Sequence, residues 1–303
     1  MDENEKKARE YLADAAKQPK GGFFHSLFSG LSFLLGLNLS SRGSDRTEER
    51  VHLYERAANC FKMAHKWQDA GDAFMKAAEL SANSKSHLDA ATNCVDASTA
   101  YRKIDPDRAI ACLTRAAEIY IEMGRFTIAA KHHMTIAEIY EKDLSNEAEA
   151  CKHYEQAADF YKGEESNSSA RKCLLKVAEI CATSDQFEKA ARIFEDAGVS
   201  SMDNKLLRYG AKEYLMKAVI CDMNYDPIKG RNLLEKFAQE YPMFSDSREC
   251  GLLKEISKAL SSDNPDDFTA AVKAYDSITR LEPWMTTMLY KLKKSLTDDE
   301  DIN

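Results

Sequence analysis

The sequence predicts an all-α protein, built as a stack of antiparallel helical hairpins. An alanine recurs about every twenty residues through the middle of the chain, which is the length of one helix plus one turn. Most of these alanines follow a larger side chain by four residues, and several precede an aromatic by three. Such offsets place side chains on one stripe of a helix, so each alanine marks a buried face. The positions are Ala58, Ala78, Ala97, Ala117, Ala137, Ala158, Ala178 and Ala197.

Two periods of this pattern make one hairpin, and the hairpin resembles a tetratricopeptide repeat with a longer unit of roughly forty residues. We expect a right-handed twisted stack of TPR-like hairpins over residues 47–200. Such stacks seldom carry out chemistry and instead present extended surfaces to partners. Breaker or polar residues mark the expected turns at positions 65–66, 83–86, 103–107, 124, 144–146, 164–168 and 184–185.

Proline is rare in the repeat region, where Pro106 is the one example between Pro19 and Pro227. Pro106 follows Asp105, which is the arrangement of a helix N-cap and a first helical residue. The scarcity of helix breakers predicts an almost wholly helical chain.

The N-terminal 46 residues divide into a short helix and an apolar segment. Residues 1–20 are charged with a small apolar stripe, and we expect them to form a helix that ends near Gln18 and Pro19. Residues 21–46 interleave five glycines with phenylalanine and leucine, a pattern too interrupted for a membrane span. The segment could pack on the protein, remain disordered, or insert shallowly into a bilayer. Flanking lysines and arginines favour insertion.

The alanine period fades after Met202, which predicts a different architecture for the C-terminal part. Residues 201–296 should form a helical bundle that caps the stack, ending in a helix around residues 284–296. Residues 297–303 form an acidic tail. Breaks between the helices of the bundle are expected at Asp226 and Pro227, Tyr241 and Pro242, and Asn264 and Pro265.

Composition and motifs argue against several classes of function. The net charge of -8 disfavours nucleic acid as the main partner, because binding phosphates requires a dominant basic surface. The eight cysteines contain no C-x-x-C pair, which predicts buried, reduced thiols without a disulfide framework or a zinc site. His132 and His133 point about 100° apart on a helix, so they cannot chelate one ion together. No nucleotide-binding or hydrolase motif occurs, and we expect no enzyme activity, no metal and no cofactor.

Basic side chains gather in the middle of the expected stack, and the acidic tail has one unusual residue. Taken alone, the basic cluster is best explained as a solvated helix face balanced by nearby glutamates. An exposed Ile302 within an acidic tail has no packing role. The basic residues are Arg125, Lys131, Lys162, Arg171, Lys172 and Lys176.

Five segments resemble the soluble NSF attachment proteins, with the alpha/beta branch as the nearest match. The resemblance implies an adaptor in vesicle fusion, located in the cytoplasm and peripherally on the cytosolic face of membranes. Such adaptors bind assembled SNARE complexes, which are acidic four-helix bundles of syntaxin-, synaptobrevin- and SNAP-25-type chains. They then recruit the hexameric ATPase NSF, which disassembles the bundle. The segments are residues 123–133, 137–141, 153–179, 244–250 and 275–296.

The resemblance also assigns roles to individual residues. The SNARE-binding positions of the family correspond to Arg125, Lys131, Lys172 and Lys176, and Lys66 stands beside a further one at His65. The membrane-contacting positions correspond to Phe23, Phe24, Leu27 and Phe28, and an extra apolar stretch at residues 31–39 predicts stronger attachment. The NSF-contacting positions correspond to Asp226, Asp298, Asp299, Glu300, Asp301 and Ile302, of which Ile302 replaces a leucine that stimulates the ATPase.

One departure from the family in the C-terminal part leaves open how fully that part engages NSF. Lys258, Ser261 and Ser262 stand where the family has a cluster of glutamates that engages NSF. The competing hypothesis is a generic TPR-like scaffold for chaperone or degradation machinery.

Overall fold

The computed structural model of the chain describes residues 2–17, 39–202 and 204–298, and every regular element in these ranges is an α-helix. This confirms the all-α prediction. Contacts divide the chain into two compact units, which are residues 1–166 (unit 1) and residues 167–303 (unit 2). The domain boundaries expected from the sequence stay a prediction.

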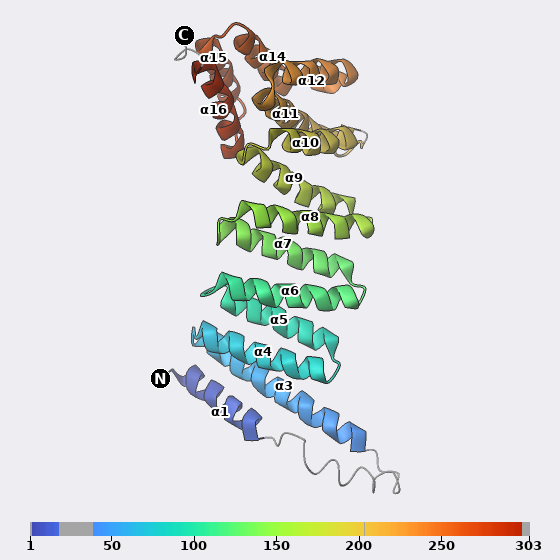
Figure 1. The fold of residues 1–303 in the computed structure, drawn as a ribbon, viewed down its shortest axis with the longest axis vertical. Helices are drawn as coiled ribbons and strands as arrows, with labels where there is room; N and C mark the ends of the chain where they lie inside the picture. The colour runs from blue at the N-terminus through green and yellow to red at the C-terminus, as the bar shows by residue number, and fades with distance from the viewer. Residues whose placement is uncertain (1, 18–38, 203, 299–303) are drawn as a thin grey trace. The chain divides into compact units, whose positions relative to one another are not determined.

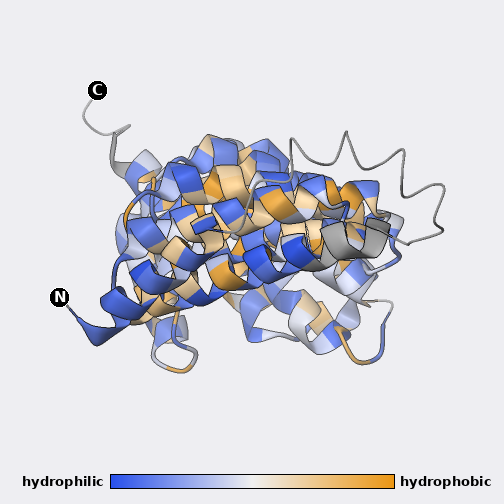
Figure 2. Ribbon diagram, turned by 90° about the horizontal axis from the view of Figure 1, so that it is seen from below, coloured by the Kyte–Doolittle hydropathy of each residue, from blue (hydrophilic) through white to orange (hydrophobic). Residues whose placement is uncertain are grey.

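Unit 1 is a stack in which each helix packs against the next one in the chain (Figure 1). Residues of opposite hydropathy alternate along individual helices, as expected for amphipathic helices that bury one face (Figure 2). The helices are α1 (Glu3–Lys17), α3 (Leu39–Met63), α4 (Trp67–Asn83), α5 (His87–Tyr101), α6 (Pro106–Glu122), α7 (Phe126–Lys142) and α8 (Glu147–Gly163).

The periodic alanines form the seam of the stack. Those at positions 58, 78, 97, 117, 137 and 158 are all at most 1% exposed. Their methyl groups let neighbouring helices approach closely, and larger side chains such as Phe74 and Tyr101 fill the remaining space. The predicted buried stripe is therefore confirmed.

A polar network ties three helices of unit 1 together at Tyr101. The Tyr101 hydroxyl donates to Oδ1 of Asp72 over 2.6 Å, and Arg108 donates to the same oxygen over 2.7 Å. The Arg108 guanidinium also lies 3.8 Å from the centre of the Tyr101 ring. One residue each from α4, α5 and α6 is thus fixed relative to the other two.

The hairpin turns repeat one backbone geometry. At the first, the N–H of Lys66 donates to the carbonyl of Phe61 and the N–H of His65 to that of Lys62. His65 has a φ of 56°, so the turn is a Schellman motif with a left-handed residue after the helix. The same left-handed conformation recurs at Lys85, Gly124, Glu165 and Asp185.

The turn between α5 and α6 uses a different device. Asp105 caps α6 by accepting a hydrogen bond from the N–H of Arg108, and Pro106 is the first helical residue. The sequence-based prediction for this pair is confirmed.

Unit 2 begins as further hairpins and closes into a bundle, because its last helix packs back against α9 and α11. Three of the expected breaks are confirmed, since Pro227, Pro242 and Pro265 each begin a helix. The helices are α9 (Asn167–Thr183), α10 (Phe187–Met202), α11 (Arg208–Tyr225), α12 (Pro227–Glu240), α13 (Pro242–Ser245), α14 (Arg248–Ser261), α15 (Pro265–Asp276) and α16 (Pro283–Asp298).

A buried lysine holds this closure together. Lys217 of α11 is 4% exposed, and its ammonium group lies 3.5 Å from Glu179 of α9 and 3.4 Å from Glu282 before α16. It also sits 5.4 Å from the ring of Trp284. Burial lowers the pKa of Lys217, but its hydrogen bond to Glu213 and the surrounding carboxylates outweigh that effect and raise the pKa.

The cysteines form no disulfide. All eight are free thiols, and seven are buried while Cys151 is half-buried. None of the described helices combines the length and apolar sequence needed to cross a membrane.

The left-handed turn at Gly124 generates a matched pair of predictions. Gly124 has a φ of 69°, which alanine adopts only with strain, so Gly124→Ala should lower the free energy of unfolding by about 1 kcal/mol. Gly163 ends α8 with open space around its α-carbon, so Gly163→Ala should leave stability unchanged or raise it slightly. Urea denaturation of both variants checks this. Equal effects of the two substitutions would contradict the turn assignment.

Candidate functional site

Three of the predicted basic residues lie on the surface of unit 1. Lys66 and Arg125 are exposed N-cap residues of α4 and α7, and neither caps its helix with the side chain. Their side chains are therefore available to a partner. Lys66 lies near Glu5, whose pKa is lowered mainly by a hydrogen bond from Arg9 and less by Lys66.

Lys131 is exposed on the face of α7 that points away from the core. The buried residues of this helix include Ala130, His133 and Ala137, which lie on the opposite side of the helical wheel from Lys131. Arg125 and Lys131 form no ion pair with any residue of the described ranges. A cation without a carboxylate neighbour keeps its full attraction for an external anion.

The remaining two predicted residues, Lys172 and Lys176, lie on α9 of unit 2. They are four residues apart and so share one stripe of the helix, away from buried Cys173 and Val177. Lys172 is exposed and has no ion pair within the described part of the chain. Lys176 lies 3.6 Å from Glu179, which also faces Lys217 at 3.5 Å. Lys176 is therefore ion-paired, unlike Lys172.

The structure adds an exposed apolar tip in unit 2 that the sequence analysis missed. Leu206, in the connection between α10 and α11, is 87% exposed, and Tyr209, near the start of α11, is 68% exposed. Arg171 of α9 reaches Ser201 in the last turn of α10 with a 3.3 Å hydrogen bond, so the end of α10 lies against the first half of α9. The available signal was two apolar residues close to Lys205 and Arg208.

Unit 2 therefore presents a mixed surface made of two parts. The cationic part is Lys172 and Lys176, and the apolar part is Leu206 and Tyr209. An acidic helical partner with some exposed apolar side chains would complement both parts.

Of the acidic residues assigned to a partner contact, two fall within the described ranges. Asp226 is exposed at the N-terminus of α12, where its Oδ1 accepts hydrogen bonds from the N–H groups of Ile228 and Lys229 over 2.8 and 3.4 Å. Asp298 is the last residue of α16. The other predicted residues lie outside the described residues, namely Asp299, Glu300, Asp301 and Ile302 in the tail and Phe23, Phe24, Leu27 and Phe28 in the apolar segment.

The histidines of α7 belong to the core of unit 1. His133 is 9% exposed, and its Nδ1 lies 3.1 Å from Nδ1 of His153 on α8. Its ring stacks on Phe160, and the ring of His132 stacks on Tyr120. No cluster of three histidine, cysteine or acidic side chains suited to a metal ion occurs among the described residues. The pair is a packing element.

Comparison with known proteins agrees with the resemblance seen in the sequence. A family profile described as "Soluble NSF attachment protein, SNAP" matches residues 6–297. The beta-soluble NSF attachment protein of Bos taurus is 50% identical, over 97% of this chain and 95% of the relative. The human alpha-soluble NSF attachment protein is 49% identical, over 98% and 97%. A protein of Schizosaccharomyces pombe described as a probable vesicular-fusion protein sec17 homolog is 34% identical, over 86% and 90%.

The buried histidine predicts that acid destabilises unit 1. Burial lowers the pKa of His133 to about 4, with smaller contributions from the charges of His153 and His132. The unfolded chain takes up a proton near pH 6.5, whereas the folded chain stays neutral at this site until about pH 4. Stability should therefore be full above pH 6.5 and fall by about 3 kcal/mol as the pH drops through this window.

Urea denaturation at several pH values measures this effect. His133→Leu should reduce the pH dependence without abolishing it, because burial also lowers the pKa values of His132 and His153. His87→Leu, at an exposed ring, should leave the dependence as in the parent. An unchanged slope in the His133 variant would refute the assignment.

Proposed function

The chain belongs to the soluble NSF attachment protein family, and we propose that it is an adaptor of vesicle fusion that binds assembled SNARE bundles and recruits the NSF ATPase. Two relatives, which this chain matches over almost their whole length, are named soluble NSF attachment proteins. A more distant relative is described as a probable vesicular-fusion protein. The protein is an adaptor and not an enzyme.

The observation that carries the proposal is the set of exposed, unneutralised cations on two units of a negatively charged chain. Arg125, Lys131 and Lys172 lack ion pairs with the described residues, although acidic residues outnumber basic ones by 50 to 42. An assembled SNARE bundle is a rod with a largely acidic surface, so charge attraction steers it to these positions. Lys176 and Lys66 contribute where their own carboxylate neighbours leave part of the charge available.

The apolar tip gives this surface a contact that salt does not screen. Leu206 and Tyr209 expose most of their side chains, and covering each of them with a helical partner contributes about 1.5–3 kcal/mol if it is buried fully. The hydrogen bond from Arg171 to Ser201 holds the end of α10, which precedes the connection, against the helix that carries the cationic residues. We infer that SNARE bundles contact both parts of unit 2.

The proposed attachment to NSF uses acidic groups at the C-terminal end of the chain. Asp226 is exposed between Tyr225 and Ile228, which are 57% and 65% exposed, so a carboxylate there is framed by apolar contacts. The tail from Asp298 to Asp301 supplies further negative charge, and Ile302 supplies an apolar group. These residues would pair with basic and apolar groups of the ATPase.

The proposed membrane contact rests on the sequence of residues 21–46. Phe23, Phe24, Leu27 and Phe28 would insert at the bilayer interface, with nearby lysines and arginines at the headgroups. This places the adaptor peripherally on the cytosolic face, where SNARE bundles are disassembled.

Charge reversal tests the proposed SNARE-binding surface. Lys131→Glu with Lys172→Glu replaces one unpaired cation in each unit, and affinity for assembled SNARE bundles should fall about tenfold or more at physiological salt. ATP-dependent disassembly of the bundles by NSF should slow in parallel, and pull-down with assembled SNAREs and a disassembly assay measure both effects.

The matched control is Lys103→Glu with Lys273→Glu, which changes two exposed lysines, one in each unit, by the same total charge. It should retain at least half of the capture and of the disassembly rate. Equal losses in the two double variants would mean that net charge, and not this surface, governs binding. Intact capture by the first double variant would leave the generic scaffold as the better hypothesis.

A second variant tests the apolar tip. Leu206→Ser with Tyr209→Ser should weaken SNARE capture about tenfold, because the partner loses the apolar surface it covers. Ile278→Ser with Tyr290→Ser changes an equally exposed pair in the same unit, at 67% and 68% exposure, and should have little effect. The tip has no role in binding if both pairs behave alike in the pull-down.

A further inference from the structure

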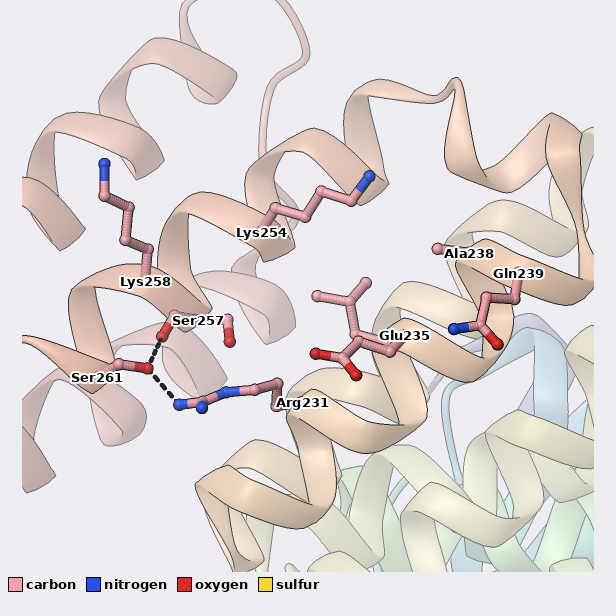
Figure 3. A pocket seen from close by; sticks show the side chains of 9 residues that line it. Arg231, Glu235, Ala238, Gln239, Lys254, Ser257, Lys258 and Ser261 are labelled. Atoms are coloured by element: carbon pink, nitrogen blue, oxygen red, sulfur yellow. Dashed lines mark hydrogen bonds between the residues drawn. The ribbon is translucent and has the colours of Figure 1, made fainter.

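Unit 2 contains a groove of about 530 Å³ between α12 and α14. Its floor is apolar, since Leu234 is 3% exposed and Ala238 lies one helical turn further along α12. Figure 3 shows side chains entering the space from both helices, with Glu235 and Gln239 on the α12 side. A volume of this size can accommodate a short stretch of peptide.

The walls of the groove are mainly cationic. Arg231 lines it from α12, and Lys254 and Lys258 line it from α14, against the single carboxylate of Glu235. The two lysines are four residues apart and so lie on one stripe of α14. The groove therefore has three cationic side chains and one anionic one, whereas the whole chain has a net charge of -8.

These cations differ from their neighbours in having no carboxylate partner. Elsewhere on α12, Lys229 lies 3.1 Å from Asp222 and Lys236 lies 3.0 Å from Glu195. By contrast, Arg231, Lys254 and Lys258 form no ion pair within residues 204–298 or the other described ranges. The charge of the groove is therefore open to an external anion.

Arg231 is held across the groove by a hydroxyl group. Its guanidinium donates to Oγ of Ser261 on α14, and Ser261 donates to the carbonyl of Ser257 over 2.6 Å (Figure 3). A neutral acceptor orients the guanidinium without consuming its charge, and its other N–H groups stay free for a carboxylate.

We propose that the groove between α12 and α14 binds a short acidic segment of a partner protein. Carboxylates of the segment pair with Arg231, Lys254 and Lys258, while an apolar side chain between them covers Leu234 and Ala238. This site goes beyond the proposed function, because it is separate from the cationic residues of α9. Lys258 and Ser261 stand where the family has glutamates that engage NSF, so the groove offers the opposite charge at that position.

The shape and charge of the groove favour a peptide over other anions. Neither a single phosphate nor a dense polyanion such as an inositol phosphate would cover the apolar floor. A concave site between two helices also does not fit a flat bilayer surface. A peptide in which carboxylate and apolar side chains alternate would pair with the cationic walls and cover the apolar floor.

Fluorescence anisotropy with the full-length chain tests the proposal, using a fluorescein-labelled peptide of sequence EDLEDLE at low ionic strength. Lys258→Glu should weaken binding by about five- to tenfold, because it removes one attraction and adds one repulsion. A peptide with serine in place of both leucines should bind about threefold or more weakly, because it leaves the apolar floor uncovered.

The matched control is Lys273→Glu, which changes an exposed lysine in the last turn of α15, just as Lys258 lies in the last turn of α14. It should change peptide affinity by less than about twofold, because only overall charge is altered. Circular dichroism checks that both variants are folded. The proposal fails if the two variants weaken binding equally, or if the leucine-free peptide binds as well as the parent. It also fails if inositol hexakisphosphate or anionic vesicles bind the groove in preference to the peptide, with that binding lost in Lys258→Glu.

Discussion

Close packing of alanine-faced helices is the constraint on which the rest of the structure depends. Ala58, Ala97 and Ala137 have no measurable exposure, and each marks the point where one helix of unit 1 meets its neighbour. Alanine loses no side-chain entropy on burial and favours the helix intrinsically, so the seam adds little cost to folding. Larger groups at these points would push the helices apart. Within unit 1, the spacing between helices, and with it the spacing of surface residues on neighbouring helices, is therefore set by methyl groups.

This rigid frame explains how a chain of net charge -8 can still offer cationic binding surfaces. Several lysines and arginines of the amphipathic helices pair with a glutamate one turn away, as Lys76 does with Glu79 and Arg192 with Glu188. Of the cations assigned to partner binding, Arg125, Lys131 and Lys172 form no ion pair with the described residues, whereas Lys176 pairs with Glu179. Because the frame holds them in place, they keep both their charge and their positions when a partner arrives, which lowers the entropy cost of binding.

The sequence predicted what is encoded locally and missed what depends on distant residues. The alanine period predicted the helices and their buried faces, and Asp105 with Pro106 predicted a cap, because each pattern acts within one or two turns. Lys217 could not be predicted as buried, since its partners Glu179 and Glu282 lie far along the chain. The exposure of Leu206 and Tyr209, and the lack of carboxylates around Arg231, likewise depend on how neighbouring helices pack. The binding role of the basic residues stays a prediction from the family resemblance, whereas the lack of ion pairs at Arg125, Lys131 and Lys172 within the described residues could be seen only in the structure.

The central claim is that cations held without carboxylate partners drive binding to an acidic bundle. The dependence of affinity on salt tests it most directly, through titration of the protein with assembled SNARE bundles over a series of sodium chloride concentrations. We expect the affinity to fall steeply as the salt concentration rises. The affinity that remains at high salt should come from the apolar contact at Leu206 and Tyr209. Affinity that stays constant across the series would contradict it, because binding would then not depend on the charges at all.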